Sequence, residues 1–148
     1  MNLLSRQSMR AIAAVVDIAL HARPQPVAAK ALAARLDLPP RRLETLLQAL
    51  VRANILVGVR GPRGGYELAR ERRRITAADI VRAAIDTDED GEQMDQAKLI
   101  RKVVAPMVLD ASQSMLQALE AVTVETLCRA ANKGGLSEKG AVNIDFTI

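Results

Sequence analysis

Two short apolar stretches with a glycine-rich loop between them constrain this chain more than any other feature. The stretches are 56–59 and 66–68, and the loop that joins them consists of Gly61-Pro62-Arg63-Gly64-Gly65. Glycine adopts backbone angles closed to other residues and Pro62 fixes its own φ, so the order predicts a tight β-hairpin. Arginines line it, namely Arg60, Arg63 and Arg70. The alternative is a solvated surface hairpin whose charge is incidental.

The segment before the hairpin has the apolar spacing of two helices joined by a turn. A helix is expected over 27–36, with Ala29, Leu32, Ala33 and Leu36 inward, and Asp37-Leu38 forms the turn. Pro39-Pro40 starts the next helix, because the first N–H groups of a helix lack partners and proline costs nothing there. That helix runs to about Ala53 on an inward face of Leu43, Leu46, Leu47, Leu50 and Val51. A helix-turn-helix followed by a basic hairpin is typical of a winged helix, a fold that mostly binds duplex DNA.

Charge is distributed unevenly along the chain. Residues 1–74 contain 14 lysines and arginines against five acidic residues, whereas residues 75–148 contain seven against 12. A basic half of this kind is the electrostatic signature of a polyanion-binding module. Tyr66 and Phe146 are the only aromatic residues, so the chain cannot build the stacking platform of single-strand binders. Duplex DNA is therefore the favoured partner.

Further helices are expected on both sides of this unit. Ser5 is the expected cap of a helix ending near Ala22, with an inward face of Met9, Ile12, Ala13, Val16, Ala19 and Leu20. Thr76 and Asp79 form a capping box that opens a helix to about Ile85. The apolar period of 98–121 predicts a long helix, which Pro106 starts or kinks. Thr123 caps a last helix that ends near Ala131.

The fold class expected from these elements is mainly α with a small β-hairpin wing. We expect a winged helix-turn-helix domain over 1–85. Residues 86–131 follow with an acidic loop, the long helix and the short last helix, and 132–148 form a flexible tail. The acidic residues of 86–95 lack the spacing of a calcium loop, and no metal site is expected.

Composition also bears on compartment and chemistry. No apolar run reaches 18 residues, so neither a signal peptide nor a membrane span is expected. The protein is therefore expected to be cytoplasmic. His21 and Cys128 are the only histidine and cysteine, and they lie far apart in sequence without a metal-ligand spacing. An enzyme is therefore not expected. Cys128, on an apolar helix face, is expected to be core, with a redox role as the alternative.

Several motifs resemble one bacterial family over about residues 3–131. They are Leu43-Glu44-x-Leu46-Leu47, Arg60-Gly61-Pro62-x-Gly64-Gly65-Tyr66, Ile75-Thr76-x-Ala78-Asp79-Ile80 and Ala13-x-x-Val16-Asp17-Ile18-Ala19-Leu20. The chain resembles the winged-helix repressors that include the iron–sulfur-cluster regulator and the nitric-oxide-sensing regulator, IscR and NsrR. The resemblance implies a homodimer joined through the long helix and a recognition helix that begins near Pro39. It also implies a wing whose Arg-Gly-Pro tip enters the minor groove.

The residues expected to contact DNA come from the recognition helix, the wing and the first helix: Arg6, Pro39, Arg41, Arg42, Glu44, Thr45, Arg60, Gly61, Arg63 and Tyr66. Glu44 matches the family's base-sensing glutamate. It either accepts a hydrogen bond from the N4 amino group of cytosine or pairs with Arg41 or Gln48 on its own helix. Arg41 and Arg42 depart from the family pattern, and each reads guanine or clamps a phosphate, so the operator sequence cannot be transferred. Gly64 and Gly65 are explained by the turn alone.

The dimer interface is expected along the long helix, at Val104, Met107, Val108, Ala111, Met115, Leu116 and Leu119. Cluster-binding members of the family carry three cysteines after the fourth helix, and residues 86–101 contain none. Cys128 alone cannot supply three thiolates. The chain is thus identified as a family member without the cluster and without another cofactor.

The function expected is a homodimeric, sequence-specific regulator of transcription, a repressor rather than an activator, on a pseudo-palindromic DNA operator. A small molecule or a partner protein is expected as effector, and a membrane is not expected as a partner. The alternative is a winged-helix protein-interaction module that binds DNA weakly. The basic charge of residues 1–74 argues against that alternative, because a protein-docking surface does not need it.

Overall fold

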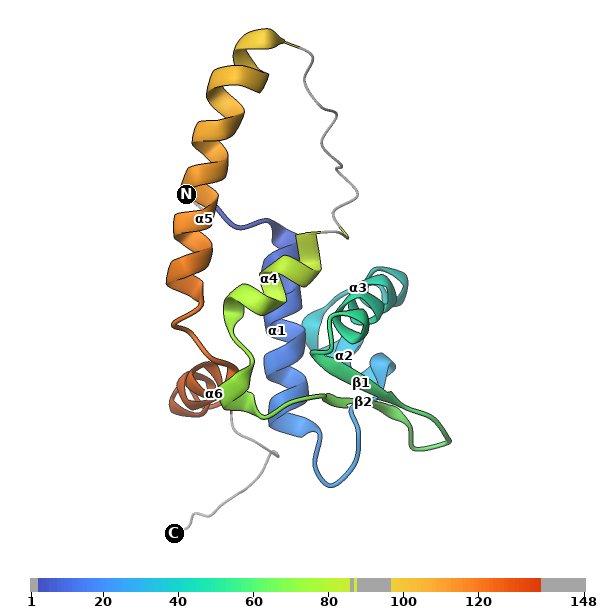
Figure 1. The fold of residues 1–148 in the computed structure, drawn as a ribbon. Coiled ribbons are helices and arrows are strands. Elements are labelled where there is room, and N and C mark those ends of the chain that lie inside the picture. The colour runs from blue at the N-terminus through green and yellow to red at the C-terminus, as the bar shows by residue number, and fades with distance from the viewer. Residues whose placement is uncertain (1–2, 86, 88–96, 137–148) are drawn as a thin grey trace.

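Helices make up most of the structure, and one two-stranded hairpin projects from them (Figure 1). The computed structural model describes residues 3–85, 87 and 97–136. Its elements in chain order are α1 (Arg6–His21), α2 (Ala29–Leu36), α3 (Pro40–Arg52), β1 (Leu56–Val59), β2 (Gly65–Leu68), the 3-10 turn η1 (Arg72–Arg74), α4 (Ala77–Ile85), the π-helical turn η2 (Ile100–Val104), α5 (Ala105–Leu119) and α6 (Val124–Lys133). The expected class, mainly α with a small β-hairpin, is confirmed.

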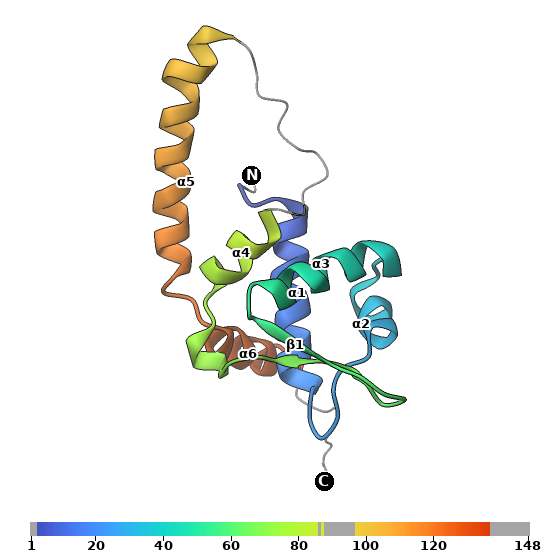
Figure 2. The same cartoon turned by 45° about the vertical axis from the view of Figure 1, so that its right-hand side comes forward.

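Helix α1 lies at the centre of the fold, with α2, α4, α6 and β2 packed around it (Figure 2). Ser5 caps it as expected, because its Oγ accepts a hydrogen bond of 3.0 Å from the Ser8 N–H. The predicted inward face was wrong in part. Met9 is 43% exposed and Ala13 is exposed, whereas the fully buried residues are Ala11, Ala14, Val15 and Ile18. A helix enclosed on several sides has no single apolar stripe for the pattern to reveal.

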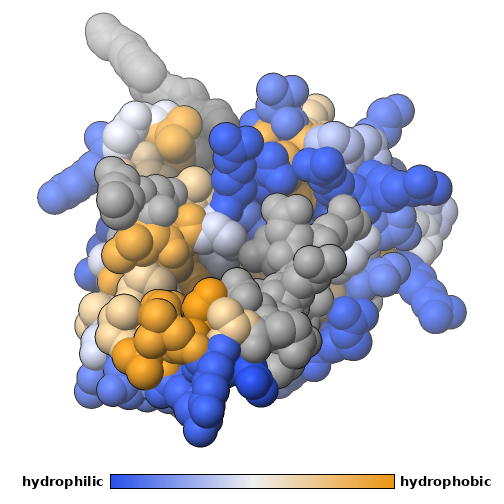
Figure 3. Space-filling view, turned by 90° about the horizontal axis from the view of Figure 1, so that it is seen from above, coloured by the Kyte–Doolittle hydropathy of each residue, from blue (hydrophilic) through white to orange (hydrophobic). Residues whose placement is uncertain are grey.

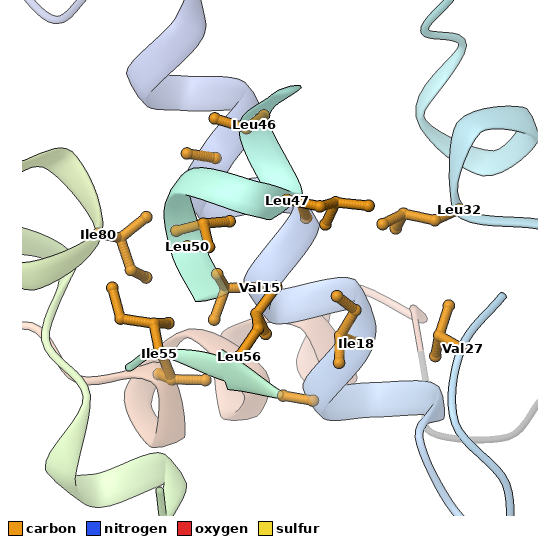
Figure 4. Close-up of a cluster of buried hydrophobic side chains, with 14 of the residues drawn as sticks. Val15, Ile18, Val27, Leu32, Leu46, Leu47, Leu50, Ile55, Leu56 and Ile80 are labelled. Carbon is orange, nitrogen blue, oxygen red and sulfur yellow. The ribbon is translucent and has the colours of Figure 1, made fainter. Parts of the chain in front are cut away.

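The helix-turn-helix consists of α2 and α3. Asp37 makes the turn in a left-handed conformation with φ 52°, and its backbone N–H bonds to the carbonyls of Ala33 and Ala34 in α2. Leu46, Leu47 and Leu50 of α3 point toward α1 and α2 in the core (Figure 4). Val51 was expected inward but is 38% exposed, and Ala49 is buried instead.

One ion pair holds α2 against α1. The Arg35 guanidinium donates two hydrogen bonds to Asp17, from Nε to Oδ2 at 2.8 Å and from Nη2 to Oδ1 at 2.7 Å. The hydrogen bond to Asp17 raises the pKa of Arg35, more than the partial burial lowers it. Bidentate pairs of this kind are the stronger ones, so Arg35 serves the fold and is not available to a ligand.

The start of α2 differs from the prediction. The helix begins at Ala29, and Val27 is extended instead, pairing through its backbone with Tyr66 of β2. The Val27 N–H donates to the Tyr66 carbonyl at 3.0 Å, and the Tyr66 N–H donates to the Val27 carbonyl at 2.8 Å. Val27 therefore adds a one-residue bridge to the β2 edge of the hairpin. Val27 and Tyr66 are 39 positions apart in the sequence, so local spacing could not predict this contact.

The capping box that opens α4 is present. The Thr76 N–H donates to Asp79 Oδ2 and the Asp79 N–H donates to Thr76 Oγ1, each at 3.1 Å. Further along α4, Arg82 donates from Nη2 to Glu120 Oε1 at 2.6 Å, which ties α4 to the end of α5.

Helix α5 continues without interruption from η2. The N–H of Ala105 reaches back five residues to the Ile100 carbonyl, as in a π-helical turn. Pro106 follows as the second residue of α5, where it has no N–H to give. The wider π turn lies directly before the proline. Pro106 thus marks the start of the regular α-helix within a longer helical rod (Figure 1).

Helix α6 closes the described chain. Thr123 caps it through a 3.2 Å bond from the Thr126 N–H to Thr123 Oγ1, and the helix ends at Lys133, two residues beyond the expected Ala131. Val124 and Cys128 belong to the same hydrophobic core as α1 and α3. The expected acidic loop, except Thr87, and the tail from residue 137 lie outside the described residues. Within the described part, no helix has the length and apolar character needed to cross a membrane.

Candidate nucleic-acid interface

The first turns of α3 present polar side chains outward. Arg41, Arg42, Glu44 and Thr45 are all exposed, while Leu43 between them is 1% exposed. Pro39, the N-cap residue, and Pro40 fix the backbone at the entry to this helix. Among the described residues, Glu44 forms no ion pair with Arg41, so the acid-base pairing within α3 that the sequence left open is not made. The Thr45 hydroxyl instead donates to the Arg41 carbonyl at 3.3 Å.

The tip of the hairpin presents a second group. Arg60, Gly61 and Arg63 are exposed, and Gly61 has φ 116°, a conformation that favours glycine. Gly64 closes the loop through its N–H to the Gly61 carbonyl at 2.9 Å. A Cβ at Gly64 would lie 2.3 Å from the Val59 carbonyl oxygen, so a side chain does not fit there. The wing has the shape that the sequence predicted.

Helix α3 and the hairpin lie on the same side of the molecule, away from α5, in both ribbon views (Figures 1 and 2). The structure thus brings the α3 residues and the wing arginines to one side. Arg6 is exposed but begins α1 at the end far from the wing, and a helix of 16 residues spans about 24 Å. Arg6 and the wing arginines are therefore separated. Tyr66 is half-buried, packs against the core and lies in β2 opposite Gly58, so it belongs to the paired strands of the hairpin and not to the exposed loop.

Several other arginines of this region are engaged within the fold. Arg70 was expected to line the wing with Arg60 and Arg63, and this was wrong. Its Nε donates to the Asn54 carbonyl at 3.1 Å, its Nη1 donates to the Arg74 carbonyl at 3.0 Å, and Nη2 lies 3.8 Å from Asp79 Oδ2. Arg70 thereby connects the turn after α3 to the turn before α4.

Of the three consecutive arginines of η1, two have partners within the fold and one is exposed. Arg72 donates to the Ala19 carbonyl of α1, and Arg73 pairs with Glu71 at 2.7 Å. Arg74 is exposed. By contrast, no acidic group of the described residues lies within 4.0 Å of the guanidinium groups of Arg41, Arg42, Arg60 or Arg63. The arginines of α3 and of the wing tip therefore carry positive charge that no acidic side chain of the described residues compensates.

A second surface, apolar, lies on α5. Val104, Met107 and Val108 are 38%, 59% and 50% exposed, and Ala111 is also exposed. Met115, Leu116 and Leu119 are half-buried within their own chain. Leu99, Val103 and Leu109 are at least 60% exposed as well; Leu99 and Val103 share the helical period of the expected interface, whereas Leu109 falls outside it. Seen from above, hydrophobic residues gather on the α5 side and hydrophilic ones on the opposite side (Figure 3).

A helix-turn-helix and a hairpin wing with free arginines on one side define a winged helix-turn-helix protein. The profile of the Rrf2 family, described as an iron-dependent transcriptional regulator, matches residues 4–130. The chain belongs to the Rrf2 family, and its function is that of a DNA-binding regulator of transcription.

Individual relatives agree with this assignment. A Synechocystis protein, slr0846, named as a candidate HTH-type transcriptional regulator, is 32% identical over 126 residues, covering 84% of this chain and 86% of the relative. Protein rrf2 of Nitratidesulfovibrio vulgaris is 28% identical over 134 residues, covering 88% and 87%. The solved structure of T. potens IscR is similar with a TM-score of 0.68 and 28% identity, covering 90% of each chain.

The residues of this chain do not fit an iron–sulfur cluster. Such clusters are held mainly by cysteine thiolates, about four in number. Cys128 is the only cysteine in the sequence and is 1% exposed in the core beside α1. Within the described residues, no three His, Cys, Asp or Glu side chains are grouped so as to hold a metal ion. The burial of Cys128 confirms the expectation that it is a core residue.

Proposed function

We propose that this protein is a homodimeric repressor that binds a pseudo-palindromic operator through α3 and the wing. The observation that carries the proposal is the division of the arginines described above. Those at the start of α3 and at the wing tip are exposed and unpaired within the described structure, whereas Arg70, Arg72 and Arg73 are held by carbonyls or carboxylates. Free guanidinium groups on one side of a winged helix are suited to duplex phosphate and base edges.

In this proposal α3 is the recognition helix. One of Arg41 and Arg42 contacts a phosphate and the other reads a guanine, and Glu44 accepts from a cytosine. Pro39 fixes the entry of the helix, and Thr45 lies on its exposed face. Arg60 and Arg63 enter the neighbouring groove with Gly61 at the tip. Arg6, remote from the wing, contributes at most to a flanking phosphate, and Tyr66 acts by holding the hairpin.

Dimerisation uses the exposed face of α5. No residue of this 15-residue helix is buried within its own chain, and Asp110 is its one charged side chain. A helix that is apolar on its exposed surface requires a partner, and a second α5 supplies matching side chains. A two-fold dimer would place two copies of α3 on successive major grooves, about 34–36 Å apart. The division into a DNA-binding part, 1–85, and a dimerisation part, 86–131, follows the same assignment.

Footprinting on the DNA upstream of the protein's own coding region tests the proposal directly. A protected pseudo-palindrome is expected, with affinity that falls steeply with salt. The logarithm of the binding constant should fall by about 0.9 per phosphate neutralised for each unit in log salt, which gives a slope of several units. A reporter driven by that DNA should be silenced by the protein. A slope near zero would favour a protein-docking module instead, and an activated reporter would contradict repression.

A further inference from the structure

A cavity of about 480 Å³ lies between the end of α1 and the base of the wing. Its apolar part is formed by Ala22, directly after α1, and Leu68 of β2, while Ile18 of α1 borders the cavity but is 0% exposed. Its polar wall follows the chain from Arg70 through η1, and Arg23 closes the side after α1. The volume is within the range of small-molecule sites. Six of the eleven lining residues are charged, so the cavity is more polar than the usual small-molecule site.

Positive charge outweighs negative charge in this cavity. Four arginines line it, Arg23, Arg70, Arg72 and Arg74, against the two glutamates Glu67 and Glu71. Glu71 is already paired with Arg73 at 2.7 Å. The guanidinium groups of Arg23 and Arg74 are exposed, and no acidic side chain of the described residues forms an ion pair with either. Two exposed arginines without an acidic partner therefore line a partly apolar cavity.

We infer that this cavity binds a small organic carboxylate with an apolar body, and that its occupancy alters DNA binding. The carboxylate would meet Arg23 and Arg74, because guanidinium groups bind carboxylates through two parallel hydrogen bonds. The apolar body would lie along Ala22 and Leu68. The binding site stands on the cavity alone, whereas its regulatory role rests on the proposed function.

The walls of the cavity connect an occupant to both parts of the DNA-binding surface. Leu68 ends β2, whose other end leads to the wing tip. Arg70 lines the cavity and also donates to the Asn54 carbonyl at 3.1 Å, directly after α3. An occupant that moves either group changes the position of the wing relative to α3. Binding in the cavity and binding of DNA would thus be coupled, because β2 and Arg70 belong to both sites.

Calorimetric titration of the full chain without DNA tests the site. Acetate, butyrate and hexanoate would be compared at constant ionic strength, with hexanamide and inorganic phosphate as probes lacking the charge or the apolar body. Affinity should rise roughly fourfold per methylene group along the carboxylate series. Hexanamide and phosphate should bind at least tenfold more weakly than hexanoate. Equal binding of hexanamide, or phosphate as tight as hexanoate, would overturn the assignment.

Two sets of variants localise the binding. The double substitution Arg23→Gln and Arg74→Gln should weaken hexanoate at least tenfold, whereas Arg129→Gln, on α6 and paired with Glu125, should leave it unchanged. Ala22→Glu should abolish binding by placing a carboxylate in the cavity. Unchanged affinity in both variants would refute the site.

The regulatory part is tested by repeating the DNA titration at saturating hexanoate. At least a threefold change in operator affinity is expected in the native protein and none in the Arg23/Arg74 double variant. If hexanoate binds without any change in operator affinity, the regulatory role is overturned and the binding site is still supported. Failure of the native protein to bind operator DNA would overturn the proposed function, and the calorimetric result would still decide the cavity.

Discussion

The backbone of Gly65 lies directly against the carbonyl of Val27, where a Cβ would come within 2.3 Å of the oxygen. This contact lets the segment before α2 pair with β2 next to the hairpin loop. Gly65 was explained from the sequence by the turn alone. Its φ is not in the left-handed region, so the close approach of Val27 is the reason for glycine at this position.

Gly65→Ala should destabilise the protein by about 1–3 kcal/mol, because the added methyl group forces Val27 away from β2. Gly58→Ala is the matched control on β1. A Cβ there would have its nearest contact at 4.0 Å, on the Tyr66 ring, so stability should change little. Urea unfolding measures both. Equal stability of the two variants would mean that the Val27 bridge contributes nothing.

Arg60→Met should weaken operator binding by about 1–3 kcal/mol. It should also reduce the salt slope by about two units if Arg60 of each subunit contacts a phosphate, since each phosphate neutralised accounts for about 0.9. The free energy of unfolding should not change, since Arg60 makes no ion pair within the described structure. Arg129→Met on α6 serves as the control. An unchanged affinity for Arg60→Met would remove the wing tip from the interface.

Arg70→Met should behave in the opposite manner. The substitution leaves the carbonyls of Asn54 and Arg74 without their donor, so we expect a loss of stability of about 1–3 kcal/mol. The salt slope of DNA binding should stay the same, because Arg70 is not aimed at phosphate. Thermal unfolding and DNA titration over a salt series separate the two effects. A lower salt slope of DNA binding with unchanged stability would show instead that Arg70 contacts DNA.

Met107→Glu combined with Val108→Glu should yield monomers that no longer bind the operator. Both side chains are at least half exposed in the single chain, so the substitutions charge the proposed interface without disturbing the core. Gln113→Glu adds a charge at an exposed polar position of the same helix and should remain dimeric. Light scattering gives the mass. Monomers that retain full affinity would show that α5 does not position the two recognition helices.

Protein purified anaerobically should be colourless and contain no stoichiometric iron, because a cluster needs about four ligands and the chain has one cysteine. Cys128→Ala should leave DNA binding and its response to peroxide unchanged, as expected of a thiol that is 1% exposed. Visible absorption and metal analysis are the measurements. A charge-transfer band with bound iron would contradict this prediction.

The sequence alone determined the elements whose causes are local. Ser5, the Thr76–Asp79 pair and Thr123 each bond to a backbone N–H three residues away, so caps and helix starts could be read from short spacings. The hairpin followed from its glycines and Pro62 in the same way. Helix α3 and the exposure of Arg41, Arg42, Arg60 and Arg63 could be predicted, because both depend on position along one helix or loop.

The tertiary structure decided what depends on distant partners. Arg60 and Arg70 look alike in sequence, yet Arg70 is held by Asn54, 16 residues away, and Arg60 is not. Val27 became a strand partner of Tyr66 rather than the start of α2, and the buried face of α1 was set by the elements that surround it. Local spacing contains no information on contacts between residues far apart in the chain, because packing and hydrogen bonding between such residues are settled only when the whole chain has folded.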